Sequence, residues 1–146
     1  MIRGEISVRR AEKADAPIIA QAERAYIDCP WTEGQIEQEI DGGAVFLVAE
    51  IDGEFCGYVS GEVTADECEI SNIAVTEAHR RKGVGKTLLT ALLSEISARN
   101  VKSVYLLVRD GNTPAIMLYQ SLGFTDVGRR KNYYKGKDAL IMRLNL

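Results

Sequence analysis

The feature that most limits the fold is an abrupt change of pattern between residues 68 and 96. Residues 68–75 form a largely apolar run of strand length, and residues 88–96 place Leu and Ile at the spacing of one helix face. Between them, residues 80–87 read Arg-Arg-Lys-Gly-Val-Gly-Lys-Thr, with two glycines and four basic residues. A glycine-rich turn before a helix exposes backbone amides and the positive end of the helix dipole, which together bind anions. We therefore expect a strand–loop–helix unit whose loop suits a diphosphate.

Other interpretations of this loop are possible. Gly85-Lys86-Thr87 matches the end of a P-loop, but Arg80 replaces the glycine that this motif requires five residues before Gly85. A dinucleotide-binding fingerprint would need a third glycine and an earlier place in the chain. Two interpretations of these eight residues therefore remain: a diphosphate site, or a solvated, basic start of a helix.

The rest of the chain alternates strand and helix patterns. We expect strands at 5–9, 44–49, 55–64, 68–75, 101–108, 127–134 and 139–144. Helices are expected after the N-cap residues Asp15, Thr32 and Asn112, and through the leucine stripe at 88–96. The order β-α-α-β-β-β-α-β-α-β-β predicts an α/β protein with a mixed sheet flanked by helices. A length of 146 residues predicts one domain, residues 1–146.

Composition excludes several classes of protein. No apolar run reaches the ~18 residues of a membrane helix, and three cysteines without a Cys-x-x-Cys pair favour a reduced, cytoplasmic compartment. The single histidine, His79, lies in a polar stretch, so we expect it to be solvated and expect no metal site. Net charge is −3, but residues 1–79 carry 17 acids and 5 bases (−12), and residues 80–146 carry 4 acids and 13 bases (+9). This split suggests two partners of opposite charge, with no membrane and no direct nucleic-acid binding.

Two motifs resemble one enzyme superfamily. Arg-x-x-Gly-x-Gly at residues 80–85 resembles the Arg/Gln-x-x-Gly-x-Gly/Ala signature of the GCN5-related N-acetyltransferases, the GNAT superfamily. Asn-x-x-Ala-x-x-Leu-Tyr-x-x-x-Gly-Phe at residues 112–124 resembles a second signature of that superfamily, at the usual distance. The element order agrees over essentially the whole chain. The resemblance implies the GNAT fold and acetyl-CoA as the cofactor.

Within that superfamily the chain most resembles the RimI-type ribosomal-protein alanine N-acetyltransferases. Cys-Pro-Trp-Thr at residues 29–32 is similar to their Phe-Pro-Trp-Ser, and Asn-Ile-Ala-Val at 72–75 to their strand of the same sequence. Residues 130–134 and 138–142 resemble their Arg-x-Asn-Tyr-Tyr and Asp-Ala-Ile-Ile-Met ending. The resemblance implies acetylation of the N-terminal α-amine of a ribosomal protein. We separately expect a monomer or weak homo-oligomer.

The same resemblance implies a set of site residues. The CoA pyrophosphate would lie on the amides of residues 81–86, and the pantetheine would pair with the backbone of Ile73 and Val75. The residues implied to bind the cofactor are Ile73, Ala74, Val75, Arg80, Arg81, Lys82, Gly83, Val84, Gly85, Lys86, Asn112, Ala115 and Tyr119. Those implied to contact the acceptor are Trp31, Asn72 and Tyr133.

Acetyl transfer needs a neutral amine, stabilisation of an oxyanion and a proton for the departing thiolate. Tyr119 falls on the motif tyrosine and is the expected general acid; the alternative is a tyrosine that only packs at the core edge. In the RimI-type enzymes a glutamate acts as the general base. Here Leu107 stands at that position and cannot accept a proton. Glu69, on the preceding strand, is the expected base. In a regular strand it would share a face with Ser71 and Ile73, although a bulge would change this. The alternatives are a water relay or a purely structural Glu69.

Two other functions remain open at this level. An acetyltransferase for a small amine such as a polyamine, amino acid or aminoglycoside would also suit the acidic first half. A CoA-binding module that has lost catalysis would suit Leu107. Intact Tyr119 and Asn112 and the complete loop disfavour that module.

Overall fold

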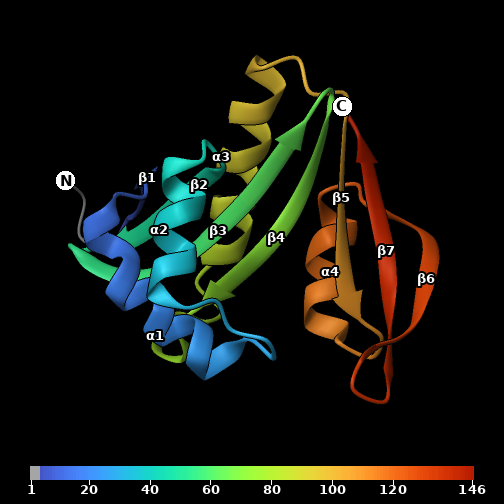
Figure 1. Ribbon diagram of the computed structural model, residues 1–146, viewed down its shortest axis with the longest axis horizontal. Coiled ribbons are helices and arrows are strands. Elements are labelled where there is room, and N and C mark those ends of the chain that lie inside the picture. The colour runs from blue at the N-terminus through green and yellow to red at the C-terminus, as the bar shows by residue number, and fades with distance from the viewer. Residues whose placement is uncertain (1–3) are drawn as a thin grey trace.

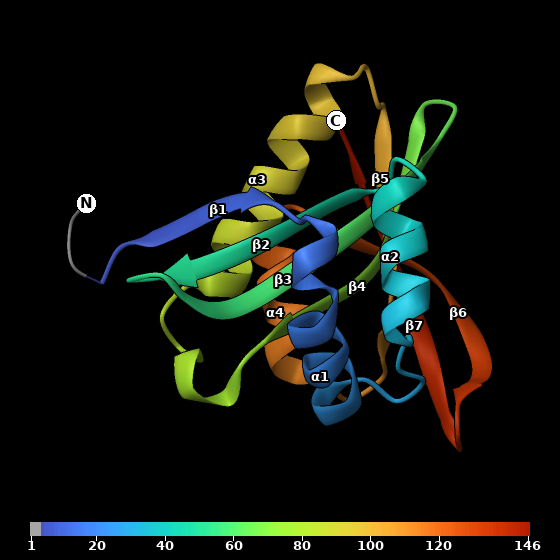
Figure 2. The ribbon, with the colours of Figure 1, turned by 60° about the vertical axis from the view of Figure 1, so that its left-hand side comes forward.

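A computed structural model describes residues 4–146 and has one seven-stranded sheet with helices on both faces (Figures 1 and 2). The strand order is β1-β2-β3-β4-β5-β7-β6, in which β4 and β5 are parallel and the other neighbours antiparallel. The predicted α/β class and element order are confirmed, with two 3-10 turns added. The strands are β1 (Ile6–Arg10), β2 (Val45–Ile51), β3 (Glu54–Thr64), β4 (Glu67–Val75), β5 (Ser103–Arg109), β6 (Thr125–Tyr134) and β7 (Lys137–Asn145). The helices are α1 (Ala16–Tyr26), α2 (Glu33–Asp41), α3 (Val84–Ala98) and α4 (Thr113–Ser121), with 3-10 turns at Lys13–Asp15 and Glu77–His79.

The core has two layers because the central strands are apolar on both faces. In β2, Phe46 and Val48 are buried on the α1/α2 face, whereas Val45 and Leu47 are buried on the face covered by α3. This is the arrangement expected of a continuous apolar run covered from both sides. Among the residues that the structure describes, no helix is long and apolar enough to span a membrane.

Local sequence signals set most element ends. Asp52 and Gly53 both have positive φ, at 51° and 79°, as a two-residue hairpin turn of type I′ requires. Thr32 forms the predicted capping box with Gln35 at the start of α2. Asp15 occupies the N-cap position of α1, but its carboxylate accepts from the Arg9 guanidinium at 2.8 Å and makes no cap bond. The expected side-chain cap is therefore wrong, because Arg9 is the stronger, charged donor.

Strands β4 and β5 separate along their length. They pair only at Glu67–Ser103, Cys68–Val104 and Glu69–Tyr105, and beyond that point β4 pairs with β3 alone. Figure 1 shows the two strands diverging toward the end of β4 that leads into α3. Residues 70–75 of β4 therefore present backbone donors and acceptors toward β5 that no strand takes up.

Candidate active site

The loop between β4 and α3 has the geometry of an anion cradle. Arg81 and Gly83 have positive φ, at 65° and 83°, so the backbone turns twice within three residues before α3 begins at Val84. In the described part of the chain, the amides of residues 81–86 donate to no other residue, and the first such donor is Thr87, to Gly83 O at 3.0 Å. Free amides at a helix N-terminus, continuous with the unpaired edge of β4, fit a diphosphate followed by an extended arm.

Two predicted cofactor residues have additional structural roles. A Cβ on Gly85 would lie 3.2 Å from Leu118 Cδ2, so glycine there allows α3 and α4 to approach closely. The Arg80 guanidinium lies over the Tyr26 ring at 4.9 Å and donates to Val75 O at 3.3 Å. Arg80 thus ties the loop to α1, and phosphate binding by its side chain stays a prediction. Of the other predicted cofactor residues, Ile73 and Ala74 lie on the free edge of β4, Arg81 and Lys82 lie in the loop, and Lys86 lies in the first turn of α3.

Helix α4 carries the predicted acid, Tyr119, on the α3/α4 face of the sheet. Asn112 is the N-cap of α4, and its Oδ1 accepts a hydrogen bond from Ala115 N at 3.4 Å. A ligand that binds this carboxamide would share it with the helix cap. Tyr119 is 6% exposed and packs with Phe124 and the α3 core on the α3/α4 face of the sheet. Burial, with a smaller contribution from Tyr134, raises the pKa of Tyr119 to about 12. The phenol therefore stays protonated near neutral pH and can act as a donor.

A β-bulge places Glu69 on the opposite face. Asn72 pairs with Ser60 and Ile70 with Gly61, which leaves Ser71 without a partner on β3. Cys68 and Ile70 face α3, so Glu69 faces the α1/α2 side. The bulge given above as the alternative to a regular strand is present, and its extra residue reverses the alternation after Ile70, so Glu69 and Ile73 lie on opposite faces. Glu69 instead shares a face with Asn72, and Tyr105 Oη donates to its Oε1 at 3.4 Å.

The α1–α2 connection forms one wall beside Glu69, and a buried carboxylate holds it. Glu23 of α1 is fully buried and accepts from Trp31 N at 2.8 Å and from Asn72 Nδ2 at 3.0 Å. Trp31 and Asn72, both predicted to contact the acceptor, are thus brought together by a residue that the sequence analysis did not single out. A signal was present: Glu23 follows Ile19 by four residues, on the apolar face of α1.

The C-terminal hairpin forms the other wall. Tyr134 Oη donates to the carbonyl of Leu107 at 3.4 Å, and the Arg109 guanidinium lies 5.3 Å from the centre of the Tyr134 ring. Arg109, the last residue of β5, also pairs with Asp28 of the α1–α2 connection, so its guanidinium bridges the two walls. Tyr133 is 52% exposed and packs edge-on against Tyr134. Tyr133 stays a predicted acceptor contact. Tyr134 lines the same wall and was not among the residues predicted from the motif to contact the acceptor.

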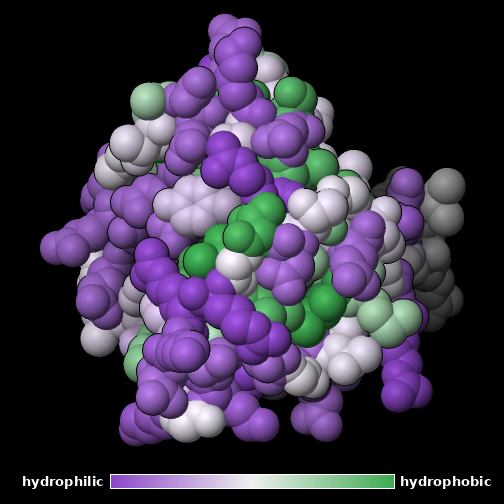
Figure 3. Space-filling model, turned by 90° about the vertical axis from the view of Figure 1, so that its right-hand side faces the viewer, coloured by the Kyte–Doolittle hydropathy of each residue, from purple (hydrophilic) through white to green (hydrophobic). Residues whose placement is uncertain are grey.

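The outer side of this hairpin is hydrophilic and basic. Figure 3 shows that side of the molecule, where hydrophilic residues surround a small apolar area. Arg129 is paired with Asp110 at 2.8 Å. Four further bases on the hairpin are exposed: Arg130, Lys131, Lys135 and Lys137. The hairpin therefore presents a basic surface beside the predicted acceptor region.

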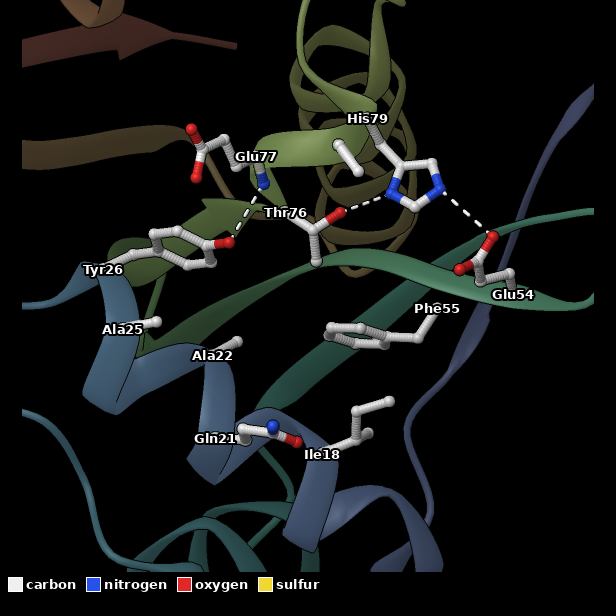
Figure 4. A pocket seen from close by; sticks show the side chains of 11 residues that line it. Ile18, Gln21, Ala22, Ala25, Tyr26, Glu54, Phe55, Thr76, Glu77 and His79 are labelled. Atoms are coloured by element: carbon white, nitrogen blue, oxygen red, sulfur yellow. Dashed lines mark hydrogen bonds and ion pairs between the residues drawn. The ribbon is translucent and has the colours of Figure 1, made fainter.

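A separate pocket of about 630 Å³ lies between α1 and the β4–α3 connection (Figure 4). His79 lines it and is buried, with Nδ1 against Thr76 Oγ1 and Nε2 3.4 Å from Glu54. The expectation of a solvated His79 is wrong, because the 3-10 turn at 77–79 folds the ring back over the start of β3. In residues 4–146 no three His, Cys, Asp or Glu side chains gather as a metal site would require.

Comparison with known proteins decides the family. A model of the acetyltransferase (GNAT) family matches residues 7–124. The chain belongs to the GNAT acetyltransferase family. This acetyltransferase is 33% identical over 144 residues to the [ribosomal protein bS18]-alanine N-acetyltransferase of Escherichia coli K12, covering 94% of this chain and 96% of the relative. It is 38% identical over 113 residues to an N-alpha-acetyltransferase of Sulfurisphaera tokodaii, covering 68% of each.

Solved structures agree with the sequence relatives. The crystal structure of the ribosomal-protein-S18-alanine N-acetyltransferase from Escherichia coli superposes on the acetyltransferase with a TM-score of 0.89 and 31% identity, covering 97% of this chain and 94% of that one. The yncA protein of Salmonella typhimurium, solved with its cofactor acetyl-CoA, shares the fold with a TM-score of 0.84 and 24% identity, over 97% of this chain and 94% of that one. The predicted fold, enzyme class and RimI-type resemblance are confirmed.

Proposed function

We propose that this acetyltransferase transfers the acetyl group of acetyl-CoA to the N-terminal α-amine of a protein, with a ribosomal protein as the favoured acceptor. The observation that carries the proposal is the opening between β4 and β5, which has Tyr119 on one face of the sheet and Glu69 on the other. The acceptor approaches from the α1/α2 face, between the α1–α2 connection and the C-terminal hairpin. Direct transfer in a ternary complex follows from this arrangement.

The cofactor side supplies binding and a proton donor. Acetyl-CoA, when bound, supplies the acetyl thioester. The free amides of residues 81–86 bind the diphosphate, and the unpaired edge of β4 at Ile73 and Val75 aligns the arm. Tyr119 donates a hydrogen bond to the departing sulfur from the α4 side, where burial has removed water.

The acceptor side removes a proton. At pH 7, neutralising a lysine with a pKa of ~10.4 costs roughly 4.6 kcal/mol, whereas an α-amine with a pKa of ~7.7–8.0 costs about 1–1.4 kcal/mol. A single partly exposed carboxylate such as Glu69, or a water beside it, suffices for the α-amine. Leu107 at the position of the family's glutamate therefore favours an N-terminal acceptor over a lysine.

A thiol-release assay with matched acceptors tests the proposal. The panel contains a peptide with a free N-terminal alanine and an internal lysine, the same peptide with a formyl-blocked N-terminus, free lysine and spermidine. We expect turnover with the free peptide alone, and mass spectrometry should place the acetyl group on its first residue. Preferential turnover of the blocked peptide or spermidine would support the lysine or small-amine function instead. Binding of acetyl-CoA without turnover of any acceptor would support a binding module.

A further inference from the structure

Glu23 is a buried carboxylate without a cationic partner among the described residues. It is fully buried, and its oxygens accept from Trp31 N at 2.8 Å, from the Tyr58 hydroxyl and from Asn72 Nδ2 at 3.0 Å. These donors come from the α1–α2 connection, β3 and β4. Burying a carboxyl group is unfavourable unless hydrogen bonds compensate for lost hydration, and these donors supply that compensation.

The chemistry of this cluster fixes the orientation of Asn72. Asn72 Nδ2 donates to both Glu23 oxygens at 3.0 Å, so the nitrogen of the Asn72 carboxamide faces Glu23 and the oxygen faces away. In residues 4–146 no group donates to Asn72 Oδ1, and the residue is partly exposed. Asn72 lies on the same face as Glu69, immediately beyond the bulge at Ser71. A free carbonyl oxygen is thus held beside the expected base.

We infer that Glu23 is a positioning residue for the acceptor. It orients Asn72 so that Oδ1 accepts a hydrogen bond from an N–H of the acceptor amine, and it fixes the Trp31 segment that forms the adjacent wall. This inference rests on the proposed function for the identity of the acceptor, but the orientation of Asn72 does not depend on it. Glu23 touches neither substrate, and acts through Asn72 and Trp31.

The variant Glu23→Gln replaces an acceptor-only group with one that also donates. Its NH2 group can bond to Asn72 only if the Asn72 carboxamide turns over, which removes Oδ1 from the acceptor face. We expect kcat/KM for the acceptor to fall about 10–100-fold, mainly through KM, while KM for acetyl-CoA stays within about twofold. Asn72→Ala should give the same loss. Because both substitutions remove the same contact between Asn72 Oδ1 and the acceptor, the double variant should have an acceptor kcat/KM no lower than that of Asn72→Ala alone.

Tyr58→Phe is the matched control, because it removes one donor to Glu23 and leaves Asn72 untouched. It should lower the melting temperature while the acceptor kcat/KM stays within about threefold of wild type. Full additivity of Glu23→Gln and Asn72→Ala, or an equal loss in Tyr58→Phe, would show a merely structural role. If Glu23→Gln does not fold, an unchanged acceptor kcat/KM in Asn72→Ala still overturns the inference.

A second measurement separates this inference from the proposed function. In 1H–15N spectra of the free protein, the Asn72 side-chain NH2 signals, assigned by their loss in Asn72→Ala, should exchange slowly with water in wild type and Tyr58→Phe. They should exchange faster in Glu23→Gln. Fast exchange in wild type would overturn the inference even if the enzyme acetylates N-termini. Slow exchange in an enzyme that prefers another amine would leave the positioning role intact and refute only the proposed acceptor.

Discussion

Replacing Tyr119 with phenylalanine tests how the phenol acts. Its pKa is raised to about 12 by burial, whereas a thiol has a pKa of ~8.5. Complete transfer of its proton to a thiolate would therefore be uphill by roughly 5 kcal/mol, at 1.36 kcal/mol for each pKa unit. A hydrogen bond to the developing thiolate is worth about 1.5–3 kcal/mol, which corresponds to a roughly 10–150-fold decrease in kcat for Tyr119→Phe. The ring contact with Phe124 is retained, so the fold should survive.

The assay is thiol release at saturating acetyl-CoA, measured from pH 6 to pH 10. Because a phenol with a pKa of about 12 stays protonated over this range, the variant should lower the pH–rate profile without changing its shape. KM for acetyl-CoA should stay within about twofold, because the phenol contributes chiefly when charge develops on sulfur. A decrease in kcat of less than about threefold, or loss of an alkaline limb present in wild type, would refute the reasoning.

Three other variants test the base and the core. Glu69→Gln should lower kcat/KM at pH 7 by about 10²-fold and move the pH optimum upward, because solvent must then deprotonate the amine; an unaltered pH–rate profile would favour a water relay. In Gly57→Ala the new Cβ would lie 2.7 Å from Ala74 O, so urea denaturation should show a loss of about 1–3 kcal/mol, and Gly34→Ala, in open space on α2, should be neutral or stabilising; equal stabilities would contradict the clash. Burial raises the pKa of Cys68 from 9.0 to about 11, so the folded state favours the neutral thiol, and roughly 2 kcal/mol of stability should be lost as pH rises from 9 to 11. Cys68→Ala should flatten that loss, and an unchanged pH dependence would exclude the thiol as its source.

Features set by consecutive residues could be predicted from the sequence. The positive φ angles at Asp52 and Gly53 follow from turn chemistry, and the loop before α3 follows from glycines at the required spacing. The position of Tyr119 on the buried face of α4 follows from helical periodicity together with the motif. Each of these features depends on interactions within a few residues, which a linear pattern records.

Features that depend on pairing between distant segments could not be predicted. The bulge at Ser71 arises from the register of β4 against β3, and no residue near Ser71 marks it. His79 is buried because a 3-10 turn brings it onto β3, although its neighbours in sequence are polar. The donors to Glu23 come from residues 31, 58 and 72, which only the folded chain brings together.

The two faces of the sheet separate the chemistry into independently variable parts. Groups that would bind the cofactor and donate the proton belong to the end of β4, α3 and α4, whereas the acceptor walls are the α1–α2 connection and the β6–β7 hairpin. Insertions or substitutions in either wall can change which amine fits without altering the phosphate cradle, and keeping Tyr134 preserves its contribution to the pKa of Tyr119. For protein engineering, residues 27–32 and 129–138 are therefore the segments to diversify when a new acceptor is sought, with the rest of the scaffold held constant.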